Sequence, residues 1–306
     1  MSKRAAQAAT TLLQLEQQVV ACTLCPRLRA YCKHVGRVRK PAFASDEYWA
    51  RPVPGFGDAQ AHLLIVGLAP AAHGANRTGR MFTGDGSDGA GAADFLARAL
   101  HGCGYASQPH SRQRGDGFEL QGAYLTAIAR CAPPGNKPLP LEVQRCALWL
   151  HRELQLLKNV RVVLALGGLA FAQLLRVLPE HGVQLPRARF GHGVQVQPLG
   201  AGPLLIGSYH PSRQNTQTGR LTPGHAGGCA ARCPLGRASM NACTAAANAH
   251  STPGVLASLQ VNEICESPVS GNIKESFAAF SCATVLVESR SLPAGELVQL
   301  LQLSGA

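Results

Sequence analysis

Four cysteines stand at spacings that can hold a metal centre: Cys22, Cys25, Cys131 and Cys146. The first two form a C-x2-C pair, and the second two enclose fourteen residues. Four thiolates can complete a tetrahedral zinc site or hold an iron-sulfur cubane, and spacing alone does not choose between them. The alternative is burial as ordinary thiols. Cys32 and Cys103 have no partner at ligand spacing and fit that alternative, although Cys32 could compete for the metal.

Two polar, glycine-containing loops carry a second group of side chains that could do chemistry. Residues 67–80 read GLAPAAHGANRTGR and residues 209–220 read YHPSRQNTQTGR. Each loop follows a short apolar run. In a parallel sheet the carboxyl ends of the strands meet at one edge, where ligands bind, so we expect the two loops to form one site.

Alternating strands and helices must position these loops. Short continuous apolar runs predict strands buried on both faces, at residues 62–68, 123–128, 160–166 and 203–208, with an additional strand at 194–197. Helices are predicted up to residue 20 and at residues 90–100, 140–157 and 169–178, and a basic, proline-containing connector at 27–57. This alternation predicts an α/β protein whose mainly parallel sheet is covered by helices on both faces.

Charge and composition narrow the function. The chain has 29 Lys and Arg against 17 Asp and Glu, and 46% of its residues are hydrophobic, which is ample for a core. Residues 1–222 hold 25 of the basic and 12 of the acidic residues, so a polyanion such as nucleic acid is the expected partner of that part. Without an apolar run of about 18 residues or a secretory h-region, we expect a cytoplasmic protein with no membrane partner. In that compartment the eleven cysteines are not expected to form disulfides.

The ordered motifs together resemble the family 5 uracil-DNA glycosylases. They are the C-x2-C pair, GLAPAAHGANRTGR, FTGD at 82–85, RCAPPGNKP at 130–138 followed by Cys146, and HPSRQNTQTGRLTP at 210–223. The resemblance covers roughly residues 10–223. It implies a three-layer α/β/α sandwich around a four-stranded parallel sheet, and a monomer that removes uracil from DNA at the bacterial nucleoid. It also implies that the four cysteines bind a 4Fe-4S cluster that stabilises the fold.

The resemblance also suggests roles in catalysis. A glycosylase flips its target nucleotide out of the duplex, and Phe82 is positioned in the motif to stack on the base. His210 could donate a hydrogen bond to O2 of the departing uracil. Asp85 would orient the attacking water or offset positive charge on the sugar. Asn136 would bind the base or a backbone group, although a turn explains this residue equally well.

The expected substrate contacts lie in the two loops. Ala69 and Pro70 occupy the position where other glycosylase classes place an acid or amide that activates water, which gives Asp85 more importance. The side chains expected to meet DNA phosphates are Arg77, Arg80, Arg213, Arg220, Asn76, Asn215 and Thr218. An apolar pocket with few polar groups would not strongly exclude other deaminated bases.

Residues 1–222 are therefore predicted to form the glycosylase domain, and 223–306 an atypical, irregular tail. After Pro223 the family would continue into an amphipathic helix, whereas this chain reads GHAGGCAAR. Back-translation of this segment in another frame encodes a family-like helix, so we interpret the tail as out-of-frame translation in which Cys229, Cys233, Cys243, Cys265 and Cys282 have no role. The alternative is a genuine appended segment.

Two other functions stay open at this level. One is a non-catalytic iron-sulfur protein that binds nucleic acid. The other is a small-molecule α/β enzyme held together by zinc.

Overall fold

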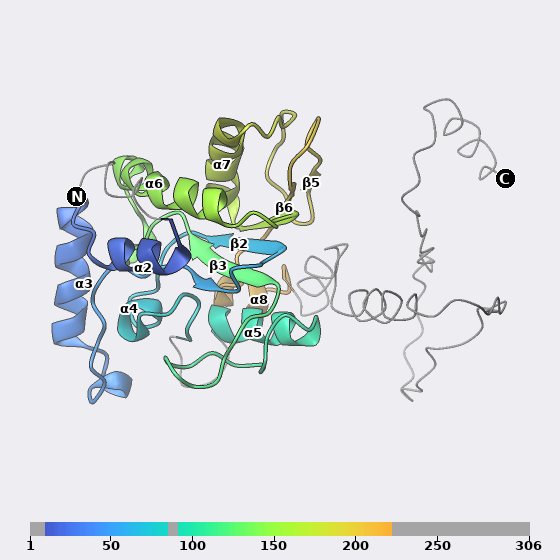
Figure 1. Cartoon of the computed structure of the whole chain (residues 1–306). Coiled ribbons are helices and arrows are strands. Elements are labelled where there is room, and N and C mark those ends of the chain that lie inside the picture. Colours follow the sequence, from blue (N-terminus) through green and yellow to red (C-terminus); the bar gives the residue numbers. More distant parts are fainter. Residues whose placement is uncertain (1–9, 85–90, 222–306) are drawn as a thin grey trace, which may run out of the picture. The chain divides into compact units, whose positions relative to one another are not determined.

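The structure is a computed structural model that describes residues 10–84 and 91–221 (Figure 1). All of these residues belong to the unit Met1–Pro253. The atypical tail predicted at 223–306 lies outside the described residues, as does the predicted catalytic residue Asp85.

Six strands form one sheet in the order β1-β3-β2-β4-β6-β5. They are β1 (Phe56–Gly57), β2 (Leu63–Gly67), β3 (Ala123–Ala127), β4 (Val162–Leu166), β5 (Gln195–Val196) and β6 (Leu204–Ser208). The four central strands are parallel, whereas β1 and β5 pair antiparallel at the two edges. The predicted four-stranded parallel sheet is therefore the centre of the observed sheet, and the additional strand predicted at 194–197 is β5. β1 was not predicted, because two residues are too few to show a period.

Helices and short 3-10 turns alternate with these strands. The helices are α2 (Leu12–Val20), α3 (Pro26–Val38), α4 (Ala75–Thr78), α5 (Ala92–Gly102), α6 (Pro140–Leu156), α7 (Gly168–Val177) and α8 (Arg213–Gln217). The 3-10 turns are η1 (Pro41–Phe43), η2 (Pro134–Asn136) and η3 (Leu178–His181). The predicted helices at 90–100, 140–157 and 169–178 are confirmed as α5, α6 and α7.

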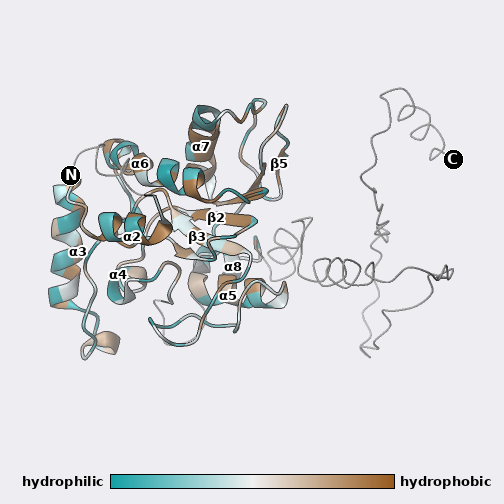
Figure 2. Cartoon of the chain, viewed as in Figure 1, coloured by the Kyte–Doolittle hydropathy of each residue, from teal (hydrophilic) through white to brown (hydrophobic). Residues whose placement is uncertain are grey.

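The sheet has an apolar core on each face, because successive side chains of a strand point to opposite sides. Leu63 and Ile65 of β2 belong to the core that includes α5, and Leu64 and Val66 to the core that includes α6 and α7. Figure 1 shows α5 on one side of the sheet and α6 and α7 on the other, and Figure 2 shows the strands as its most apolar elements. The predicted three-layer α/β/α sandwich is confirmed.

The prediction of a connector at 27–57 is wrong for its first part, which forms α3. Pro26 begins this helix, where its missing N–H costs no hydrogen bond and its fixed φ favours the helical turn. Leu28, Cys32 and Val35 lie on one face of α3 and are buried. The many charged residues of α3 concealed this narrow apolar stripe in the sequence.

Candidate active site

A cavity of about 460 Å³ opens beside the loops that follow β2 and β6. It is lined by Leu68, Ala69, Pro70, Ala71, Ala72, His73, Ala75, Met81, Phe82, Thr83, Gly91, Ala92, Ala93, Asn136, His210 and Ser212. Its size suits a small ligand. Because the central strands are parallel, the loops after their carboxyl ends converge here, as the sequence predicted.

Phe82 forms part of the cavity wall at the end of β2. A Cβ added to Gly67 would lie only 2.7 Å from Cζ of Phe82, so the ring rests directly on the strand end. Phe82 also has a φ of 52°, a left-handed conformation that a non-glycine residue seldom adopts. Such strain persists where the surrounding structure enforces it, commonly at binding sites. The structure thus exposes an aromatic face to the cavity, as stacking on a base would require.

His210 reaches the same cavity from the loop after β6. Its carbonyl oxygen accepts hydrogen bonds from Nδ2 of Asn215 at 2.8 Å and from the backbone N–H of Ser212 at 2.8 Å. On the other side, the backbone N–H of Tyr209 donates to Nδ1 of His192 at 3.3 Å. The backbone that carries His210 is therefore fixed from both directions. Asn215, predicted to contact DNA, instead positions His210 in this structure.

The remaining predicted cavity residues lie where the sequence placed them. Asn136, Ala69 and Pro70 all line the cavity. Asn136 ends η2 with a φ of 57°, so it also forms the turn that was its alternative explanation. The loop after β2 therefore presents an apolar wall in place of an acid.

His73 also lines the cavity, although the sequence argument passed over it. Its Nδ1 lies 3.0 Å from Oη of Tyr48, and the two rings meet edge to face with centroids 6.1 Å apart. The signal was present, since His73 is the one ionisable side chain in the first half of GLAPAAHGANRTGR. Only the folded chain brings Tyr48 against it.

The four predicted metal-binding cysteines line one small cavity between α2, α3, the segment after β3 and α6. All four are buried. Burial raises the pKa of Cys146 to about 12, so this thiol would be protonated at neutral pH unless a metal stabilised the thiolate. Within the part of the chain that the structure describes, however, no three His, Cys, Asp or Glu side chains form a group that could hold a metal ion.

Unpaired hydrogen-bond donors surround the same thiols. Nη1 of Arg29, Nε and Nη1 of Arg130 and Nε1 of Trp149 are buried without a hydrogen-bond partner, and all three residues line the cysteine cavity. Arg130 does pair with Glu153 through its third nitrogen, at 2.5 Å. Buried donors are nearly always satisfied, so this cluster of unsatisfied donors indicates a missing acceptor.

Comparison with known proteins agrees with this geometry. The family model of the uracil DNA glycosylase superfamily matches residues 54–229. The chain is 49% identical over 216 residues to the type-5 uracil-DNA glycosylase of Mycobacterium tuberculosis, covering 70% of this chain and 78% of the relative. It is 53% identical over 206 residues to that of Thermus thermophilus (67% and 89%) and 45% identical over 205 residues to that of Pyrobaculum aerophilum (67% and 84%). The chain belongs to the type-5 uracil-DNA glycosylases.

Three side chains of the first loop of this type-5 family member do not meet the expectation of phosphate contact. Asn76 is fully buried and donates to the carbonyl oxygens of Cys32 and Ala72. Arg77 is 8% exposed and forms an ion pair with Asp46 at 2.6 Å. A phosphate contact needs an accessible donor. In this structure both residues instead hold the loop itself in place.

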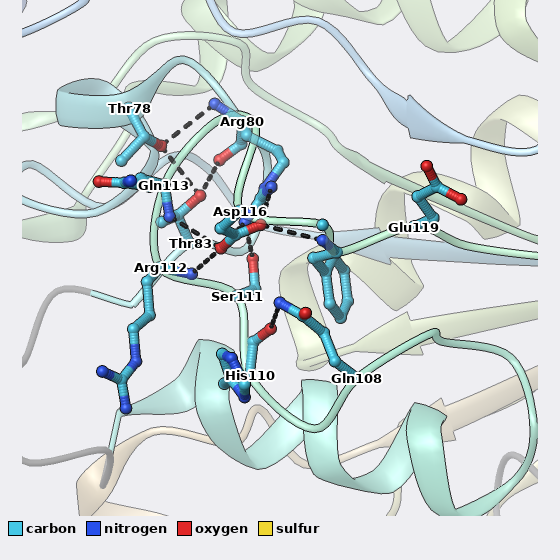
Figure 3. A network of polar contacts seen from close by, with 12 residues as sticks. Thr78, Arg80, Thr83, Gln108, His110, Ser111, Arg112, Gln113, Asp116 and Glu119 are labelled. Atoms are coloured by element: carbon cyan, nitrogen blue, oxygen red, sulfur yellow. Dashed lines mark hydrogen bonds and ion pairs between the residues drawn. The ribbon is translucent and has the colours of Figure 1, made fainter.

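Arg80 is the third corrected residue, and a polar network encloses it (Figure 3). Its guanidinium bonds both carboxylate oxygens of Asp116, at 2.7 and 2.8 Å, and Oγ of Ser111 at 2.8 Å. The guanidinium also lies 5.6 Å from the ring centroid of Phe56 and 5.4 Å from that of Phe118. Arg80 thus ties the 105–120 segment to the loop that carries Phe82.

The second loop keeps two exposed candidates, Thr218 and Arg220. The side chain of Arg213 is not among those that the structure describes. None of the helices in the described part has the length and apolar character needed to cross a membrane.

Proposed function

We propose that this protein is a uracil-DNA glycosylase that hydrolyses the bond between uracil and deoxyribose in DNA and leaves an abasic site. The observation that carries the proposal is the single cavity at the carboxyl edge of the sheet, which combines Phe82, Asn136 and His210. The type-5 relatives support it, since each is named a uracil-DNA glycosylase.

The chemistry requires the base to be extruded, held and then separated from its sugar. Phe82 offers the aromatic face on which an extruded pyrimidine stacks. As the bond breaks, negative charge develops on the base, chiefly at O2, and an N–H of His210 stabilises it by a hydrogen bond. The fixed backbone around His210 supports this role, because a donor aimed in advance costs no reorganisation during the reaction.

The attacking water is the least constrained part of the proposal. We assign Asp85 to orient it, or to offset the positive charge on the sugar, and Asn136 to hold the base or the water. This assignment is supported by the apolar wall at Ala69 and Pro70, which offers no acid for the task.

A uracil-containing oligonucleotide with an end label tests the proposal. Incubation followed by alkali cuts the strand wherever a base has been removed. We expect the protein to generate cut strands and His210→Ala to generate almost none, while His101→Gln, an exposed histidine of α5, serves as the matched control. Retained DNA binding without excision by the folded protein would support the non-catalytic binding protein instead.

We further propose that Cys22, Cys25, Cys131 and Cys146 hold a 4Fe-4S cluster. In a cubane each cysteine binds a different iron, so the thiols need not converge on one point as they must around zinc. The unsatisfied donors of Arg29, Arg130 and Trp149 are supported as partners of its sulfur atoms. When bound, the cluster would supply a covalent cross-link between the N-terminal helices and the rest of the fold.

Iron and sulfide analysis tests the cluster. We expect about four of each per chain and a broad visible absorbance. Cys131→Ser should abolish both, whereas Cys103→Ser should change neither, because Cys103 does not line the cysteine cavity. A colourless protein with bound zinc would contradict the proposal.

The expected setting follows from the substrate. We infer that the protein works as a monomer on DNA of the nucleoid, in the reducing cytoplasm where thiolate ligands persist. Light scattering of the purified protein would test the oligomeric state.

A further inference from the structure

His73 is the second histidine of the reaction cavity and has no part in the mechanism above. It lies in the loop between β2 and α4, is half-buried, and lines the cavity beside the apolar wall of Ala69 and Pro70. A polar group on such a wall has to be oriented by its neighbours to be useful. The contacts of Tyr48 show how its ring is oriented.

Tyr48 determines which nitrogen of His73 carries the proton. The hydroxyl of Tyr48 is buried, accepts the backbone N–H of Lys40 at 3.4 Å and lies 3.0 Å from Nδ1 of His73. Among the described residues, Nδ1 is the only acceptor that the structure gives this hydroxyl. Burial also raises the pKa of Tyr48, so the hydroxyl keeps its proton at neutral pH. Tyr48 therefore donates to Nδ1, and the neutral ring of His73 carries its hydrogen on Nε2.

We propose that His73 donates its Nε2–H to an oxygen of the extruded nucleotide, and that Tyr48 is the positioning residue that fixes this tautomer. This inference rests on the proposed glycosylase function. The acceptor is a carbonyl oxygen of the base or an oxygen of the adjoining phosphodiester. Both present the same chemistry to an N–H donor.

The consequence is a gain in selectivity that the apolar wall cannot give. A cavity lined by alanine and proline rejects a wrong ligand only by its size. A donor in a largely desolvated site loses its water partner when the nucleotide enters, so a ligand without a matching acceptor is disfavoured. His73 and His210 would then contact different atoms of the same nucleotide.

Four variants test the hydrogen bond and its orientation: His73→Leu, His73→Gln, Tyr48→Phe and the double variant Tyr48→Phe with His73→Gln. We expect His73→Leu to lower kcat/KM for uracil excision about tenfold to hundredfold, because one hydrogen bond in the site is lost. His73→Gln should recover most of that loss, since its amide nitrogen reaches a similar position. Tyr48→Phe should lower kcat/KM severalfold in the parent and have no effect in the His73→Gln background, where no tautomer is left to fix.

Binding of an oligonucleotide that already contains an abasic site identifies the acceptor. If His73→Leu weakens this binding as strongly as it lowers excision, the acceptor is a phosphodiester oxygen. If the binding is unchanged while excision of uracil and hypoxanthine falls by different factors, the acceptor belongs to the base.

The inference is overturned if His73→Leu excises uracil at the parental rate, or if Tyr48→Phe has the same effect in both backgrounds. His101→Gln controls for the loss of any histidine, and the thermal midpoint of each variant shows that it is folded. A parent protein that excises nothing would contradict the proposed function instead, so the two failures are distinct.

Discussion

The ion pair between Arg80 and Asp116 allows a quantitative test of what holds the active-site loop. Asp116→Asn removes the charge but keeps the shape of the side chain. The wild-type carboxylate accepts two bonds from Arg80, as well as the backbone N–H groups of Arg112, Gln113 and Phe118. An asparagine keeps a single acceptor oxygen and turns an amide nitrogen toward the arginine.

The expected cost follows from burial. The side chains of Arg80 and Asp116 are only 5% and 11% exposed, so the substitution leaves an uncompensated charge in the interior. Breaking such a pair costs about 3–5 kcal/mol of the free energy of unfolding. For a domain of this size, we expect the thermal midpoint to fall by about 6–12 °C at pH 7. Uracil excision should fall as well, because Phe82 follows Arg80 by two residues.

The pH dependence gives the same reasoning a sign. Burial by itself raises the pKa of Asp116, but the bonds from Arg80 and from three backbone N–H groups outweigh it and hold this pKa well below its usual range. A lowered pKa in the folded state stabilises the protein above the unfolded pKa of about 3.9, and this stabilisation is lost as the pH falls further. The difference between wild type and Asp116→Asn should therefore narrow below about pH 4.

Glu119→Gln is the matched control, since it removes one negative charge from the same segment at an exposed position. Its thermal midpoint should stay within about 2 °C of wild type. Equal midpoints for Asp116→Asn and Glu119→Gln would refute the reasoning, as would a difference from wild type that is the same at pH 7 and pH 3.

Three further outcomes are expected. Gly67→Ala should lower kcat/KM at least about tenfold with little change in thermal midpoint, because the added Cβ would lie 2.7 Å from the ring of Phe82; Gly102→Ala, with nothing within 4 Å, is its control and should be neutral. His192→Phe keeps the stacked ring beside Tyr209 but removes the acceptor of its backbone N–H, so excision should fall about tenfold, whereas His192→Asn should restore an acceptor and most of the rate. DNA binding measured by fluorescence anisotropy should weaken by more than about tenfold between 50 and 200 mM salt; binding that ignores salt would contradict the expected phosphate contacts.

Much of the architecture could be read from the sequence. The apolar run that forms β2 and the helical pattern of α6 are local signals, and each depends only on neighbouring residues. Parallel strands then bring their carboxyl ends together, which is why Phe82, Asn136 and His210 could be assigned to one site before any coordinates were known. The four cysteines could likewise be grouped from their spacing and the resemblance.

The structure decided what long-range packing decides. Arg80 looked like a phosphate ligand because its partner Asp116 lies 36 residues away, and no local pattern reveals such a pair. The same holds for His73, whose partner Tyr48 is 25 residues away, and for the donors of Arg130 that face the cysteines. A sequence period records which face of an element is buried, but it does not record which side chain lies opposite. The tautomer of His73 and the burial of Arg80 therefore became visible only in the folded chain.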